Sequence, residues 1–201
     1  MKTPTSVSIF AALTIALIGP VHAAFITPTA VVASNGEDTA ITMIDGLGLS
    51  DDPGTEMSTH EPDGSGMWSA VGSIKANVSF DLGATMDIEK VYIWNYNVAN
   101  NTPIGMKDLE IQVSADTDLG TARFTTVSQV TLTEGGETAQ IFDIVATDVR
   151  WIRLNGLSNW GNGFTVGLAE VRFGSGDIAG STPFVEVSNP IDGDVIPLGS
   201  T

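Results

Sequence analysis

The stretch that decides the fold is NVSFDL, residues 77–82. Its apolar side chains, Val78, Phe80 and Leu82, fall on alternate positions and so share one face of an extended chain. The same alternation recurs in DLEIQVS, residues 108–114. A strand with one apolar face buries that face against another layer, so this pattern predicts a half-buried sheet.

Similar stretches follow in both directions, separated by turns rich in Gly, Asn, Asp and Thr. The further strands predicted in this way are residues 24–32, 89–95, 124–132, 139–145, 151–154 and 167–173. No segment has a sustained helical period, and the one long irregular stretch is residues 45–73. Short strands at this spacing predict an all-β fold, an antiparallel β-sandwich.

The length suits one medium domain, and the composition argues against several classes of function. The chain has 201 residues, 24 acidic against 8 basic side chains, a formal net charge of -16 and no cysteine. A chain this acidic is repelled by nucleic acid phosphates and by anionic membranes, so we expect neither as a partner. The lack of cysteine excludes disulfides, thiolate catalysis and cysteine-ligated zinc.

The N-terminal segment, residues 1–23, has the pattern of a signal peptide. Lys2 supplies the positive charge, residues 9–18 are apolar, and the segment ends in the small-residue pattern Val-His-Ala, so we expect cleavage before Ala24. The alternative is an uncleaved anchor. Export of a cysteine-free chain favours a bacterial protein that is secreted, periplasmic or on the cell surface.

The mature chain divides into a domain and a tail. We expect one β-sandwich domain at residues 24–173 and a Gly/Ser-rich linker at residues 174–183. Residues 184–201 contain a strand-like stretch and a turn, which fit the truncated start of an immunoglobulin-like module or a plain tail. The first alternative implies other domains in a longer chain.

Three motifs in a fixed order carry a resemblance to a known family. They are IDG at residues 44–46, VYIWNYN at residues 91–97 and AEVRF at residues 169–173. Together they resemble the discoidin domain, also called the factor V/VIII type C domain, over residues 33–173. The resemblance implies a jelly-roll sandwich with the galactose-binding-like fold, and in most members a non-catalytic binding module.

A structural calcium site is expected near the first motif. Calcium prefers several oxygen ligands, and Asp45 lies in a tight Gly-rich loop whose carbonyls could turn inward. The resemblance implies that Asp45, Ser50, the carbonyl of Ala169 and Glu170 hold one calcium ion. If Val171 faces the core, strand alternation places Ala169 on the same side and Glu170 on the other. The alternative is that Asp45 only caps a turn and Glu170 pairs with an arginine.

Candidate sugar ligands lie in the predicted loops. A sugar ring needs an aromatic surface and planar polar groups, which Trp160, Asn97, Asn162 and His60 would supply. Each has a structural alternative, since loop asparagines commonly hold turns and a lone histidine is commonly solvated. The other tryptophans, Trp68, Trp94 and Trp151, lie in or beside predicted strands, and we expect them to pack in the core or on the sheet.

Catalytic motifs are absent from the sequence. It has no G-x-S-x-G elbow and no H-E-x-x-H zinc motif, so we expect no enzyme activity. The sequence therefore predicts an exported, non-catalytic carbohydrate-binding module with structural calcium and a glycan or polysaccharide as its partner. The alternative is a structural or adhesive spacer domain that binds no small ligand.

Overall fold

The computed structural model describes residues 24–51 and 57–175. The predicted signal peptide, residues 1–23, and tail, residues 184–201, lie outside the described residues, as do residues 176–183 of the predicted linker. Within the described part, neither helix has the length or apolar character needed to cross a membrane.

The described residues form strands with two short 3-10 helices. The strands are β1 (Ala24–Ile26), β2 (Ala30–Ala33), β3 (Trp68–Val71), β4 (Asn77–Asn95), β5 (Asp108–Ser114), β6 (Thr125–Thr131), β7 (Gln140–Gly156) and β8 (Thr165–Ser175). The 3-10 helices are η1 (Glu37–Met43) and η2 (Thr102–Ile104). β5 coincides with the prediction, whereas β3 lies in the stretch expected to be irregular. β4 and β7 each join two predicted strands, and β8 continues into the predicted linker as far as Ser175.

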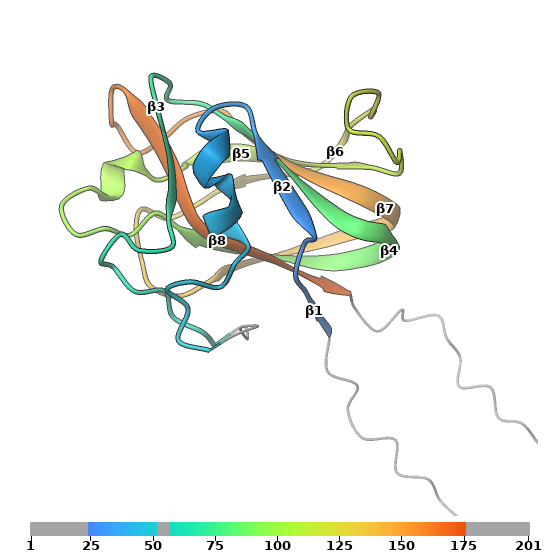
Figure 1. The fold of residues 1–201 in the computed structure, drawn as a ribbon, viewed down its shortest axis with the longest axis horizontal. Coiled ribbons are helices and arrows are strands. Elements are labelled where there is room, and N and C mark those ends of the chain that lie inside the picture. Colours follow the sequence, from blue (N-terminus) through green and yellow to red (C-terminus); the bar gives the residue numbers. More distant parts are fainter. Residues whose placement is uncertain (1–23, 52–56, 176–201) are drawn as a thin grey trace, which may run out of the picture.

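All strand pairs are antiparallel, and two layers form because β4 and β7 bend (Figure 1). The first layer contains β2, residues 77–81 of β4, residues 149–156 of β7, β5 and β6. The second layer contains β1, β3, β8, residues 88–95 of β4 and residues 140–146 of β7. This confirms the predicted antiparallel sandwich.

The bends occur where the pairing of β4 with β7 shifts in register. Gly83 has φ 80°, a conformation that L side chains rarely adopt, and Asp148 on β7 has φ 56°. The Asp148 backbone N–H donates to the Asp87 carboxylate at 3.0 Å, which holds the two bends together. Such irregularities are where strands of a sandwich pass from one sheet to the other.

The main core lies between the two layers. Phe80 in the first layer meets Phe173 in the second, with ring centroids 5.5 Å apart and an edge-to-face angle of 70°. Ile111 and Ile152 line the first layer and are fully buried. Phe80 and Ile111 belong to the alternating stretches from which the sandwich was predicted.

A second, smaller cluster lies on the other side of β4 and β8. Tyr92, Trp94 and Ala169 are buried there, with Leu49 and Met67 packed against them. The Trp94 indole N–H donates to the Ser58 carbonyl at 2.9 Å. Residues 45–51 and 57–67, here named the covering segment, therefore close over the outer face of the second layer. Of the tryptophans expected to pack, Trp68, Trp94 and Trp151 are 0, 0 and 7% exposed.

Candidate functional site

At one end of the sandwich, the loop that precedes β8 lies against the loop that follows β4 (Figure 1). The backbone N–H of Trp160 donates to the Gly105 carbonyl at 3.2 Å. The backbone N–H of Asn162 donates to the Pro103 carbonyl, also at 3.2 Å. These bonds join two loops far apart in sequence into one continuous surface, which is named the loop end below.

Trp160 is half-buried in this surface rather than fully open. The Lys107 ammonium lies 4.9 Å from the centroid of the indole ring, a cation–π distance. The indole N–H is buried and has no hydrogen-bond partner within the described residues. A ligand at Trp160 would therefore meet a ring that already has Lys107 against it.

Asn162 holds the turn of its own loop. Its side-chain oxygen accepts the backbone N–H groups of Phe164 and Thr165 at 2.9 and 2.8 Å. Its carbonyl accepts the side-chain amide of Asn159 at 2.7 Å. The side-chain oxygen of Asn162 is therefore occupied by its own loop. This is the turn-holding role that was the alternative for a loop asparagine.

The structure adds an aromatic residue that the sequence reasoning missed. Phe164 is 62% exposed, and its carbonyl accepts the backbone N–H of Gly72 at 2.8 Å. Val71, beside Gly72, is 68% exposed. No local pattern indicates this exposure, because strand alternation would place Phe164 on the same face as the buried Val166.

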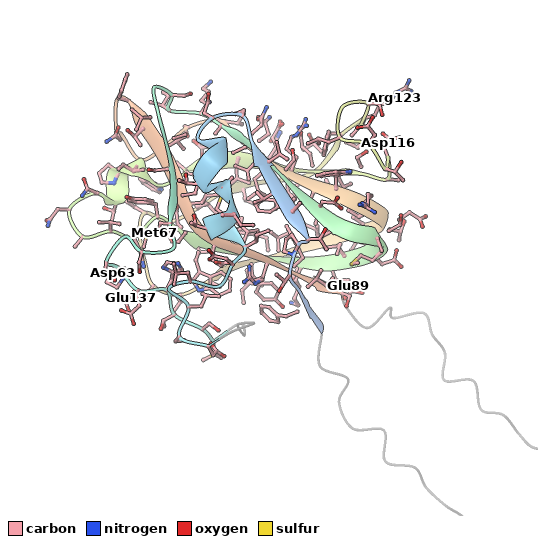
Figure 2. The ribbon with its side chains drawn as sticks, in the orientation of Figure 1. Asp63, Met67, Glu89, Asp116, Arg123 and Glu137 are labelled. Carbon is pink, nitrogen blue, oxygen red and sulfur yellow. The ribbon has the colours of Figure 1, made fainter. Side chains whose placement is uncertain are left out.

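His60 and Asn97 are enclosed, which corrects the expectation of exposed loop side chains. They are 0 and 5% exposed, and the Asn97 amide donates to the His60 carbonyl at 2.8 Å. The backbone N–H of His60 donates to the Glu137 carbonyl at 2.7 Å, which brings a distant loop onto the covering segment. Figure 2 shows Asp63 and Glu137 on the loops of this region. His60 and Asn97 thus hold the covering segment, and their side chains are closed to solvent.

Asp45 and Ser50 lie at the start of the covering segment and are exposed. The Asp45 carboxylate accepts the backbone N–H of Leu47 at 2.9 Å, a turn-capping contact. The Ser50 hydroxyl accepts the backbone N–H of Thr59 at 3.1 Å and donates to Asp51 at 3.3 Å. Asp45 and Ser50 are thus each engaged in local structure.

Ala169 does not share the face of Val171, and the reason is a bulge. Trp94 pairs with Glu170 and Asn95 with Leu168, so Ala169 is the extra residue on β8. Its side chain packs with Trp94 on the outer side, whereas Val171 lies in the main core. The strict alternation predicted for these positions was therefore wrong.

Glu170 is fully buried and forms an ion pair with Arg172, which is also fully buried. Arg172 donates in addition to the Val171 carbonyl at 3.1 Å. The second carboxylate oxygen of Glu170, Oε2, is buried without a hydrogen-bond partner in the part of the chain that the structure describes. A buried anionic oxygen without a partner is costly, and a cation would satisfy it.

The fit of these residues to calcium is partial. The unpartnered Oε2 of Glu170 suits a cation, and Leu49 packs on the cluster that contains Ala169, which brings the Asp45 loop beside β8. Against this, Arg172 already neutralises Glu170. In residues 24–51 and 57–175, no group of three or more His, Asp or Glu side chains is placed to hold a metal. A calcium site here would depend on two carboxylates, the Ser50 hydroxyl and the Ala169 carbonyl.

Comparison with solved structures shows the same fold in sugar-related modules. A chitosan-binding module from a Paenibacillus sp. IK-5 chitosanase/glucanase matches with a TM-score of 0.53 and 19% identity over 77% of this chain and 100% of that chain. A family 32 carbohydrate-binding module from Clostridium perfringens, in complex with galactose, matches with a TM-score of 0.53 and 18% identity over 75% and 98%. Another module from C. perfringens, in complex with GalNAc-β-1,3-galactose, matches with a TM-score of 0.52 and 15% identity over 73% and 94%.

The family is shown by the sequence. No curated protein matched the chain. The family model for the F5/8 type C domain matches residues 34–171, which include the first two motifs, the first three residues of the third, and every strand from β3 to β7. The chain therefore belongs to the F5/8 type C, or discoidin, domain family.

Proposed function

We propose that this chain is a non-catalytic carbohydrate-binding module that meets its glycan at the loop end. The observation that carries the proposal is the exposed ring of Phe164, on the same loop as the half-exposed Trp160. Aromatic faces stack on the C–H side of sugar rings, and the neighbouring loop polar groups then bond hydroxyls. Structural neighbours in complex with galactose and with a GalNAc-galactose disaccharide support this ligand class.

We infer a non-catalytic role from the lack of catalytic motifs in the sequence and from the position of His60. His60, the single histidine among the described residues, is fully buried and bonded within the covering segment. It therefore offers no general base at the loop end. The role of the module is to hold a larger protein, or the cell, close to a carbohydrate.

A glycan array followed by titration calorimetry tests the loop end. We expect dissociation constants in the millimolar to micromolar range for a shallow single site. Phe164→Ala should weaken binding about tenfold or more, because it removes the exposed ring, and Trp160→Ala should weaken it less. Val145→Ala is the matched control, since Val145 is 88% exposed on β7 before its bend.

Two results would contradict the proposal. Binding that ignores both aromatic substitutions would place the glycan elsewhere. A folded protein that binds no glycan on the array would favour the spacer alternative, in which the domain only separates its neighbours.

Structural calcium stays a prediction with its own test. The ion would be held by Asp45, Ser50, the Ala169 carbonyl and Glu170. The Oε2 atom of Glu170 has no hydrogen-bond partner among the described residues and is available as a ligand. A cation bound only by the folded state stabilises it, by about 2.7 kcal/mol at a hundredfold excess over the dissociation constant. We expect calcium to raise the melting temperature of the wild type but not of Asp45→Asn. A wild-type melting temperature unmoved by calcium and by EDTA would overturn the prediction.

Export is proposed from residues 1–23. Mass spectrometry of the product from a bacterial host should find Ala24 as the first residue, because signal peptidase accepts the small residues that precede it. A mature protein that begins at Met1 would overturn the proposal.

A further inference from the structure

The outer face of the first layer carries a row of polar side chains that the loop end does not use. Asn77 on β4 pairs in register with Asn155 on β7, Asn155 with Glu110 on β5, and Glu110 with Gln129 on β6. Neighbouring positions such as Leu154 face the main core, so this row faces outward. Four strands thus place planar amides and a carboxylate side by side.

Hydrogen bonds to Glu110 hold two members of this row, Asn155 and Gln129, together with the neighbouring Gln112. Its carboxylate accepts the side-chain amides of Asn155 at 2.8 Å, Gln112 at 2.9 Å and Gln129 at 3.2 Å. All three bonds use amide N–H groups and leave the amide oxygens outside the network. The amides are therefore oriented before any ligand arrives, which lowers the entropy cost of binding.

Two hollows flank the row, and the surface that runs from one to the other across the row is here named the groove. One, of about 350 Å³, is lined by Ser34, Lys75, Ala76, Asn77, Asn155, Gly156 and Leu157. The other, of about 180 Å³, is lined by Asp108, Leu109, Gln129, Val130, Thr131 and Leu157. Leu157 is common to both and is 39% exposed. From β4 to β6 the groove spans three strand spacings of about 4.8 Å, or roughly 14 Å.

An aromatic ring lies beside the row on the same face. The Phe124 ring stacks on the Arg153 guanidinium, with 3.6 Å between the guanidinium carbon and the ring centroid. Arg153 is two residues from Asn155 on β7 and so shares its outward face. Leu157 and Phe124 thus add apolar surface to a floor of amides.

We propose that this groove is a second binding site, which takes a linear, neutral glycan chain lying across the strands. Adjacent sugar hydroxyls match paired amide and carboxylate groups, and the apolar surface suits the C–H faces of the rings. The length of the row fits several sugar units rather than one. A polyanionic glycan is disfavoured, because Glu110 and Asp108 offset Lys75 and Arg153 at this face and the chain as a whole has a formal net charge of -16.

The ligand class is that of the proposed function, but the surface is different, so the two can fail separately. We would titrate the wild type with cellohexaose, xylohexaose, laminarihexaose and galactose and follow the side-chain amide signals of Asn155, Gln112 and Gln129 by NMR. At least one hexasaccharide should shift these signals, and galactose should not.

The double variant Asn77→Ala/Gln129→Ala should weaken hexasaccharide binding about tenfold or more. Both residues are exposed, so the fold should survive, and Thr125→Ala at the start of β6 is the matched control. Phe164→Ala should leave these amide shifts unchanged. Amide signals that respond to no hexasaccharide, or a double variant that binds as the wild type does, would overturn the second site. Stronger groove binding by a mannuronate hexasaccharide than by any neutral one would overturn its ligand class.

Discussion

The two layers of the sandwich share β4 and β7 but have very different outer faces. On the second layer, the covering segment encloses Trp94, His60 and the Glu170–Arg172 ion pair. On the first layer, the amides of Asn155 and Gln129 donate to Glu110 and border two open hollows. A charge costs little to keep at an open face and much to keep in an enclosed one, so the same kind of group is structural on one side and available for binding on the other.

The largest expected effect comes from breaking the enclosed ion pair. Arg172→Met should lower the free energy of unfolding by about 3–5 kcal/mol, because it leaves the buried Glu170 carboxylate without its partner. Adding Glu170→Gln should recover much of the loss, since the double variant buries no unpaired charge. Denaturant unfolding measures both.

The matched control is an ion pair at the surface. Lys90 and Asp143 lie 2.8 Å apart with side chains 35 and 83% exposed, so Lys90→Met should cost about 0–1 kcal/mol. If Arg172→Met is as stable as Lys90→Met, the Glu170–Arg172 pair is not enclosed by the covering segment in the way described.

A smaller effect is expected from disturbing the covering segment itself. Gly48 has φ +95°, and a Cβ there would lie 2.6 Å from the His60 ring. Gly48→Ala should therefore cost about 1–3 kcal/mol and increase hydrogen exchange in residues 57–67. Gly163→Ala is the control, because a Cβ at Gly163 meets nothing within 4 Å. Equal stability of the two variants would contradict close packing of the cover.

The open face should tolerate change better. Asn155→Ala removes one of three amides from Glu110 and should cost about 1 kcal/mol, since water and the remaining two donors still solvate the carboxylate. Thermal unfolding of this variant beside Arg172→Met ranks the two faces directly. A cost as large as that of Arg172→Met would mean that the amide row is structural rather than available to a ligand.

The sequence predicted what depends on local periodicity. Alternation of apolar residues identified β5 and the core face of β4, because a strand with a buried face carries that pattern wherever it occurs. The bulge at Ala169 was missed, since an extra residue on one strand is defined only by its partner strand. The burial of His60 was missed for a related reason, as it depends on contacts with the distant Glu137 and Asn97.

The candidate sites divide in the same way. Trp160 was identified as a candidate because its loop is rich in Asn and Gly. The exposure of Phe164, in contrast, depends on the backbone contact with the distant Gly72. The row from Asn77 to Gln129 has no local signal, because its members come from four strands and meet only through register. A site formed by cross-strand register therefore cannot be predicted from the local pattern of one sequence.

The smallest expected effect concerns Asp108, at the β6 end of the groove. The Ser158 and Thr131 hydroxyls each donate to its carboxylate at 2.7 Å and hold its pKa below the ordinary 3.8. A pKa lowered by folding means that the ionised carboxylate contributes stability above about pH 4, and that this contribution is lost as pH falls through the folded-state pKa. The carboxyl is exposed, so the contribution is small.

Comparison with Asp108→Asn isolates this contribution, because Asp63 and Asp116 also have lowered pKa values and would titrate in both proteins. The difference in free energy of unfolding between wild type and variant should be constant from pH 5 to 7 and shrink towards pH 2. A difference that does not change with pH would show that the two hydroxyls do not hold the carboxylate. If it shrinks as expected, Asp108 is ionised throughout the neutral range, and the groove keeps an anionic end that repels acidic glycans and tolerates neutral ones.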